Sequence, residues 1–171
     1  MGMLMWAGVV VAILGAGRGV VAQQKTPVPD AEAQAPARKA AGDLYGERFR
    51  AAKTSAEKTA LAKEMLQAAL KMQDGTADQY VLLDIARDVA AGAGDAQTAL
   101  AAVEKLAGRF DVPGAKLKAE TLLTAARRAS TSTQHKAVAE AASGVIAELA
   151  AADDYKTAIS VCESARSAAQ K

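Results

Sequence analysis

The sequence has few of the residues on which most enzymes rely for acid–base or nucleophilic chemistry. Its 171 residues include one histidine, His135, and one cysteine, Cys162. A catalytic histidine usually works with a nucleophile and an orienting group, and a zinc site needs several cysteine or histidine ligands. We therefore expect no catalytic, cofactor-binding or metal-binding residues, and we predict that the chain is not an enzyme.

Aromatic residues and excess charge are also scarce. Phe, Trp and Tyr together make up 4% of the chain, which gives no aromatic surface on which bases or sugars would stack. The chain has 21 basic and 19 acidic residues, so its formal net charge is +2. Without a basic block it cannot neutralise many phosphates, and we predict no binding to nucleic acid. A single cysteine permits no disulfide within the chain, so folding does not require an oxidised framework.

Alanine, by contrast, is abundant. It accounts for about a quarter of the residues, and it is the strongest helix former because it loses no side-chain entropy in a helix. The length suits one domain with a modest core. This composition predicts an all-α fold.

Residues 1–22 have the character of an export signal. An apolar run over residues 3–16 is too short for a confident membrane span, and it is followed by Val-Val-Ala at 20–22, which suits signal peptidase. We predict cleavage before Gln23 and a periplasmic or secreted bacterial protein. If the leader is retained, it tethers the protein to the membrane instead.

The same leader imitates a dinucleotide-binding turn. Gly15 and Gly17 fit the glycine pattern that follows the first strand of such folds. Val20 occupies the third glycine position, however, and the sequence that follows is rich in proline rather than helical. Because the motif has meaning only between a strand and a helix, we favour the signal peptide over a nucleotide site.

Residues 23–37 consist largely of Gln, Pro and Ala with scattered charge, and they include Pro27, Pro29 and Pro36. Such a composition offers little apolar surface for burial. We predict a disordered or extended linker between the leader and the folded domain.

Beyond the linker, apolar residues recur with helical spacing, which predicts a helical-repeat domain over residues 38–171. We expect about seven helices, joined by short connections that make neighbours antiparallel. Thr54 with Glu57, and Thr76 with Gln79, have the spacing of a capping box. The residues expected to open the helices after the first are Thr54, Thr76, Asp95, Pro113, Ser132 and Asp153.

Each of these helices has an apolar stripe that predicts its buried face. The positions expected to be buried are Leu61, Met65, Ala69, Leu82, Ile85, Ala86, Val89, Ala99, Leu100, Val103, Leu106, Phe110, Leu117, Leu122, Ala126, Val138, Ala142, Val145, Leu149, Tyr155, Ala158, Ile159, Cys162 and Ala165. The stripe assigns Cys162 the role of a small buried hydrophobe. We expect Asp84, Arg87 and Asp88 to form a solvated face, and His135 to be a solvated or boundary residue.

The sequence also repeats itself. RAAKTSAEKTALAK (50–63) aligns without gaps on RRASTSTQHKAVAE (127–140), and residues 95–104 align separately on residues 154–163. The two alignments imply different periods. This disagreement indicates degenerate helical hairpins rather than a regular tandem array.

The segments GDAQTAL (94–100) and DDYKTAI (153–159) resemble the turn and second-helix start of a tetratricopeptide repeat. The chain more closely resembles the alanine-rich, tetratricopeptide-like helical regions of exported bacterial proteins than a regular tetratricopeptide array. The resemblance implies antiparallel helical hairpins stacked as a short right-handed solenoid. It also implies that Ala99 and Ala158 are the small residues at which paired helices approach closely.

These observations favour a non-enzymatic, exported scaffold that binds an unidentified protein or peptide and has no small-molecule cofactor. Two alternatives remain open. In the first, the chain is an accessory or regulatory domain for a separate enzyme. In the second, it is a membrane-tethered helical spacer, because residues 1–22 are not removed.

Overall fold

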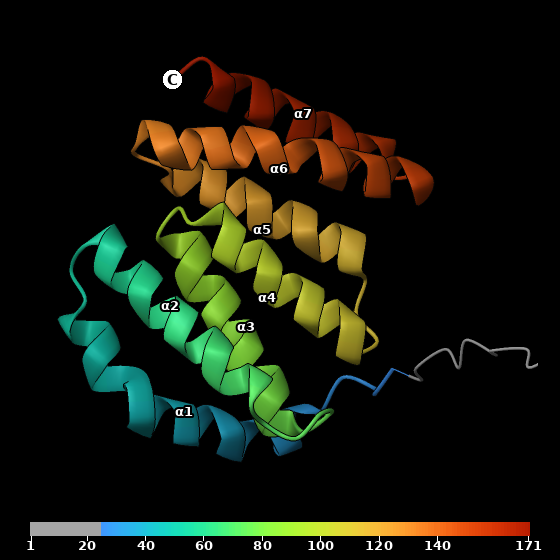
Figure 1. Cartoon of the computed structure of the whole chain (residues 1–171). Coiled ribbons are helices and arrows are strands. Elements are labelled where there is room, and N and C mark those ends of the chain that lie inside the picture. The colour runs from blue at the N-terminus through green and yellow to red at the C-terminus, as the bar shows by residue number, and fades with distance from the viewer. Residues whose placement is uncertain (1–24) are drawn as a thin grey trace, which may run out of the picture.

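A computed structural model describes residues 25–171, and within this range the fold is all-α with seven helices (Figure 1). The helices are α1 (Ala31–Ala51), α2 (Ser55–Leu70), α3 (Ala77–Gly92), α4 (Ala96–Arg109), α5 (Gly114–Arg128), α6 (Ser132–Ala151) and α7 (Tyr155–Ala169). The predictions of an all-α fold and of about seven helices are confirmed. The predicted signal peptide, residues 1–22, lies outside the described residues.

The helices follow one another across the molecule, from α1 at one end to α7 at the other (Figure 1). Each helix packs against the next helix and the next but one, and no helices further apart in order touch within the described part of the chain. Each odd-numbered helix packs against the next odd-numbered one: α1 on α3, α3 on α5 and α5 on α7. These contacts are more extensive than those of α2 with α4 and of α4 with α6. All the helix packing is therefore local in sequence.

The structure differs from the predicted linker, because α1 begins at Ala31 rather than near residue 38. The carboxylate of Asp30 accepts a hydrogen bond of 2.8 Å from the backbone N–H of Ala33 and so caps the helix. Pro36 lies inside α1, where it removes one helical hydrogen bond. Ala37 and Tyr45 are the buried residues of this helix.

The segment before α1 is held by backbone hydrogen bonds rather than by burial of its side chains. The N–H of Thr26 donates to the carbonyl of Arg109 (2.8 Å), and the N–H of Asp111 donates to the carbonyl of Thr26 (2.9 Å). These bonds form an isolated parallel bridge between Thr26 and Phe110, at the end of α4. Composition alone does not reveal such an attachment, since any non-proline residue can make these bonds.

The helix starts agree closely with the predicted caps. Thr54 and Glu57 form a complete capping box at α2, and Thr131 forms another with Gln134 at α6. At α3, Thr76 accepts from the N–H of Gln79, whose own side chain instead accepts from the N–H of Gly75.

The last helix begins one residue later than predicted. Asp154, rather than Asp153, accepts from the backbone N–H of Thr157 and caps α7. Asp153 precedes it with a φ of 56°, in the left-handed region.

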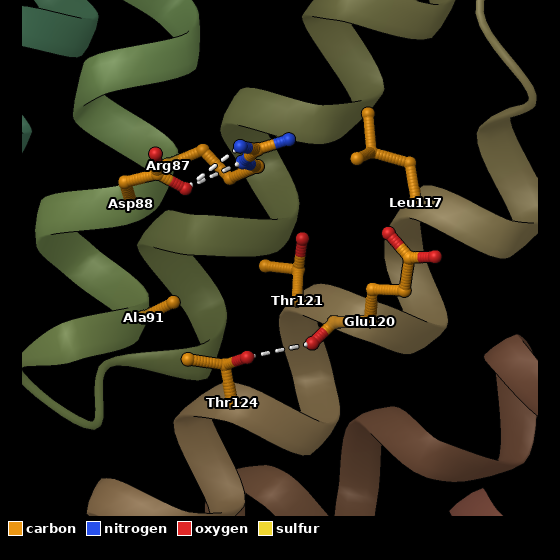
Figure 2. Close-up of a pocket in the computed structure, with 7 residues that line it drawn as sticks. All are labelled: Arg87, Asp88, Ala91, Leu117, Glu120, Thr121 and Thr124. Atoms are coloured by element: carbon orange, nitrogen blue, oxygen red, sulfur yellow. Dashed lines mark hydrogen bonds and ion pairs between the residues drawn. The ribbon is translucent and has the colours of Figure 1, made fainter.

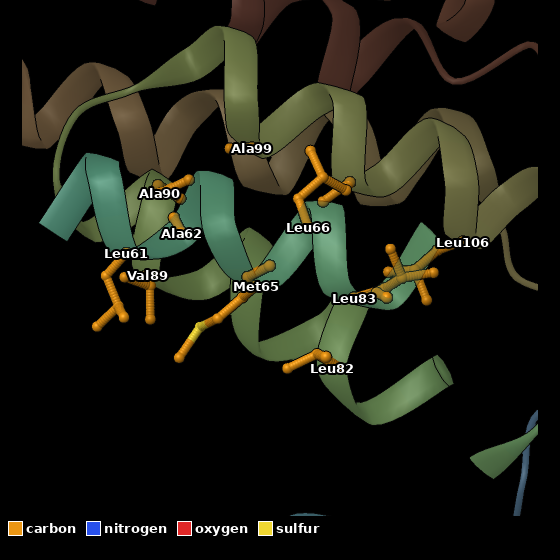
Figure 3. Packing of buried hydrophobic residues seen from close by; sticks show 14 of the residues in the cluster. Leu61, Ala62, Met65, Leu66, Leu82, Leu83, Val89, Ala90, Ala99 and Leu106 are labelled. Atoms are coloured by element: carbon orange, nitrogen blue, oxygen red, sulfur yellow. The ribbon is translucent and has the colours of Figure 1, made fainter. Parts of the chain in front are cut away.

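The buried side chains form two clusters. The first surrounds α3 and joins it to α1, α2 and α4; Figure 3 shows its members on the last three of these helices, α2, α3 and α4. The second joins α5, α6 and α7 to the start of α4. Ala99 is fully buried in the first cluster and Ala158 is 8% exposed in the second, as predicted. Alanines at such positions let helix axes approach closely, because they leave no long side chain between the helices.

The predicted stripe of α7 is wrong in register. The structure buries Val161 and Ala168 beside Ala158, whereas Ile159 is 60% exposed and Cys162 is also exposed. Within residues 25–171, α7 packs only against α5 and α6, so it buries a narrower face than a helix with neighbours on more sides does. The prediction that Ile159 and Cys162 are buried, which rested on their apolar character, is therefore wrong.

Candidate functional site

A cleft of about 210 Å³ opens between α3 and α5 (Figure 2). Its walls combine charged, hydroxyl and apolar side chains from the two helices. The lining residues are Arg87, Asp88 and Ala91 of α3, and Leu117, Glu120, Thr121 and Thr124 of α5. Because α3 and α5 pack directly against each other, the cleft lies in the layer formed by the odd-numbered helices.

The α3 wall carries a partly buried ion cluster, so the prediction of a solvated face holds for Asp88, whose side chain is 67% exposed, but is wrong for Asp84 and Arg87. A nitrogen of Arg87 lies 2.9 Å from a carboxylate oxygen of Asp84 and 2.7 Å from one of Asp88. Asp84 also accepts a hydrogen bond of 3.1 Å from Arg38 of α1. The side chains of Asp84 and Arg87 are 14% and 17% exposed. The prediction failed because it treated α3 alone, whereas α1 and α5 shield this face.

The ion cluster holds the guanidinium group of Arg87 in place, and, besides burial, its Asp84 carboxylate contributes to a raised pKa of the nearby Tyr80. Two nitrogens of the guanidinium group bond to Asp88, while its far end extends across the opening towards Leu117 (Figure 2). Burial, together with the negative charge of Asp84, raises the pKa of the Tyr80 hydroxyl above its ordinary value. Tyr80 packs edge-on against Phe110 with ring centroids 5.1 Å apart. One basic group is therefore held at a defined position in the cleft.

The α5 wall supplies an exposed carboxylate, Glu120, and two hydroxyl groups. The hydroxyl of Thr124 donates to the backbone carbonyl of Glu120 (2.9 Å) and accepts from Arg127 (3.0 Å). Thr121 is 5% exposed. The cleft thus presents charges of both signs and hydroxyl groups above the side chains of Leu117 and Ala91.

The sequence analysis placed Arg87 on a solvated face and did not single out Glu120, Thr121 or Thr124. The available signal was their spacing, since positions 120, 121 and 124 share one side of a helix and adjoin Leu117 one turn earlier. The sequence pattern does not show which helix lies against that side of α5, because the packing of α5 on α3 is a tertiary feature.

His135 is buried, which corrects the prediction of a solvated or boundary position. It is 8% exposed, and its Nδ1 atom has no hydrogen-bond partner among the described residues. His135 lies on the same side of α6 as the buried Val138, Ala142 and Val145, at helical spacing. The stripe therefore extends one turn further towards the helix start than its aliphatic members indicate.

The structure does not bring His135 and Cys162 together. His135 lies in the first turn of α6, at the end far from the α6–α7 connection, and Cys162 is an exposed residue near the middle of α7. Over residues 25–171, no group of three or more His, Cys, Asp or Glu side chains is arranged to hold a metal ion.

Comparisons with protein-family models, curated proteins and solved structures find no match to this chain. None of the seven helices is both long enough and apolar enough to cross a bilayer. Function is therefore inferred from the chemistry and position of the cleft between α3 and α5.

Proposed function

We propose that the protein is an exported, non-enzymatic scaffold that binds an extended segment of a partner protein in the cleft between α3 and α5. The observation that carries this proposal is that a fixed cation, Arg87, and an exposed carboxylate, Glu120, lie on facing walls of one cleft. Binding sites commonly place a few polar groups in fixed positions among apolar ones, and this cleft has that character.

The order of helix packing supports a tetratricopeptide-like solenoid as the scaffold. In such proteins each repeat contacts only its neighbours, and the stacked helices offer a continuous binding surface. The more extensive contacts among α1, α3, α5 and α7 favour curvature towards the odd-numbered layer. The cleft lies in this layer, where a curved array would receive a ligand.

The chemistry of the cleft suits a peptide better than a metal or a nucleic acid. Arg87 can donate to a carboxylate or a backbone carbonyl, and Glu120 can accept from a backbone N–H or a basic side chain. Thr121 adds a hydroxyl group between them. No cofactor is needed for this type of recognition.

Export is part of the proposal and rests on residues 1–22. We expect protein recovered from the periplasm or medium to begin at or near Gln23, because 20–22 is the small-residue exit from the apolar run. Intact-mass measurement tests this directly. A mass that retains Met1 would instead support the tethered alternative.

The binding proposal is tested with a library of random peptides displayed on phage and selected against the purified protein. Enriched peptides are then titrated by calorimetry into the wild type, Glu120→Lys and Glu140→Lys. Glu140 is the matched control, because it is an exposed glutamate on α6 outside the cleft. Both changes reverse one surface charge, so folding should be preserved in each.

We expect Glu120→Lys to weaken binding about tenfold or more and Glu140→Lys to leave it within about twofold, since only the first change alters the electrostatics of the cleft. Equal affinities for all three proteins would place the binding site elsewhere. A selection that enriches no peptide would contradict the peptide-binding function itself.

A further inference from the structure

The outer face of α7 is exposed and apolar at its centre. Tyr155 is 59% exposed and Ile159 is 60% exposed, and the exposed Cys162 follows on the same side of the helix. α7 is the outermost helix at the C-terminal end of the array (Figure 1). We call the side of α7 that carries Tyr155, Lys156, Ile159, Cys162, Glu163 and Arg166 the outer face.

The internal repeat indicates which kind of element covers such a face. Residues 154–163 align with residues 95–104, so Ile159 corresponds to Leu100 of α4 and Cys162 corresponds to Val103. Leu100 packs against the cluster formed with α5 and α6, and Val103 is fully buried. In α4, therefore, other helices cover the equivalent positions.

The charges on the outer face are complementary to a second copy of the same face. Residues 156 and 163 are equally far, along the helix, from a point between residues 159 and 160. If two α7 helices cross antiparallel at that point, Lys156 of each copy faces Glu163 of the other. A parallel arrangement would instead place like charges opposite each other, which is unfavourable.

We propose that α7 mediates homodimerisation by antiparallel packing of its outer face against the same face of a second copy. The two Ile159 side chains meet at the two-fold axis, and two symmetric Lys156–Glu163 pairs flank them. Tyr155 of each copy lies near Arg166 of the other, within reach of a cation–π contact. Such an interface is isologous and closed, so it yields dimers rather than fibres.

The interface is small and the association is correspondingly weak. Two four-turn helices that touch along one face bury less than the roughly 1,200–2,000 Å² of most stable complexes. We therefore expect a dissociation constant in the micromolar range. This surface shares no residue with the cleft between α3 and α5, so the inference is independent of the proposed peptide binding.

Charge reversal tests the pairing. Sedimentation equilibrium across the micromolar range is expected to show a monomer–dimer equilibrium for the wild type. Lys156→Glu and Glu163→Lys should each weaken it about tenfold or more, because each change puts two like-charged pairs in contact. An equimolar mixture of the two variants should form heterodimers, since opposite charges then face each other at both positions.

Position-specific crosslinking tests the register. In a Cys162→Ser background, Ile159→Cys should oxidise to a covalent dimer, because residues at the axis face each other closely. The native Cys162 should not form such a disulfide. The two Cys162 residues of the dimer are offset by about 7.5 Å along the helix axis, which is beyond disulfide reach. Circular dichroism checks that each variant remains helical.

Several outcomes would overturn the proposal. They are a wild type that stays monomeric throughout the concentration range, a mixture of the charge variants that remains monomeric, or crosslinking through Cys162 in preference to position 159. If a different protein covers the outer face of α7, the wild type is expected to stay monomeric throughout the concentration range.

Discussion

The side-chain amide of Gln134 donates a hydrogen bond of 2.8 Å to the backbone carbonyl of Ala93. The bond joins the first turn of α6 to the turn between α3 and α4, so two parts of the chain that lie 41 residues apart meet in space. The same side chain completes the capping box with Thr131. One glutamine thus serves a local cap and a contact between distant turns.

Gly94, next to Ala93, allows the two turns to approach. Its φ is +78°, and a Cβ atom at this position would lie 3.0 Å from the carbonyl oxygen of Arg128. We predict that Gly94→Ala lowers the free energy of unfolding by about 1–3 kcal/mol, through backbone strain and steric overlap. Urea denaturation measures the change. Gly92→Ala is the control, because a Cβ there meets nothing within 4 Å and helix propensity favours alanine.

Ala99 and Ala158 provide a test of close helix packing. We expect Ala99→Leu and Ala158→Leu each to lower the free energy of unfolding by about 1–3 kcal/mol, since added methyl and methylene groups overpack a filled core. Ala147→Leu, on the exposed side of α6, should change it by less than about 0.5 kcal/mol. Unchanged denaturant midpoints for both buried variants would contradict the close approach of helices at these positions.

Glu57 gives the protein a pH-dependent helix cap. Hydrogen bonds from the backbone N–H groups of Thr54 and Lys53 hold the pKa of Glu57 below its ordinary value of 4.5. A lowered carboxyl pKa stabilises the folded state above the ordinary value, and this contribution is lost as the pH falls through the folded-state pKa. We therefore predict that Glu57→Gln reduces the loss of stability on acidification below about pH 5.

Urea midpoints at neutral and acidic pH check this prediction, with Glu140→Gln as the control for removal of one exposed carboxyl group. The second capping box already contains an amide, Gln134, so the fold tolerates glutamine in this role. If Glu57→Gln and the wild type lose stability equally on acidification, the cap does not contribute to the pH dependence.

His135 offers a route to a more stable protein. Its buried Nδ1 atom has no hydrogen-bond partner within residues 25–171, and an unsatisfied buried polar atom costs about 1–3 kcal/mol. We predict that His135→Leu, which keeps most of the volume and the apolar stripe of α6, raises the free energy of unfolding by about 1 kcal/mol. Thermal denaturation followed by circular dichroism tests it. A decrease of similar size would mean that the imidazole makes a stabilising contact.

The features predicted correctly from sequence are those that depend on residues a few positions apart. The capping box of Thr54 and Glu57 and the cap formed by Asp95 are local, and both occur where predicted. The stripe of α4 succeeded because α4 has helices on more than one side, so that Val103 and Leu106 are covered.

The failures share a different cause. Burial of His135, exposure of Ile159 and the shielding of Arg87 all depend on which helix lies alongside. That information is absent from the periodicity of a single helix. The cleft escaped prediction for the same reason, because α3 contributes Arg87 and α5 contributes Glu120 from positions far apart in the sequence.

The bridge between Thr26 and Phe110 has a consequence for the order of unfolding. It ties the segment before α1 to the end of α4, so the first four helices are enclosed in one loop of chain, whereas α7 is held by packing at the opposite end. Separating α1 from the molecule requires that this bridge break as well. Amide hydrogen exchange should therefore show α7 opening before α3 and α4, with the protection of the Thr26 and Asp111 amides, which form the bridge, lost together with that of α1.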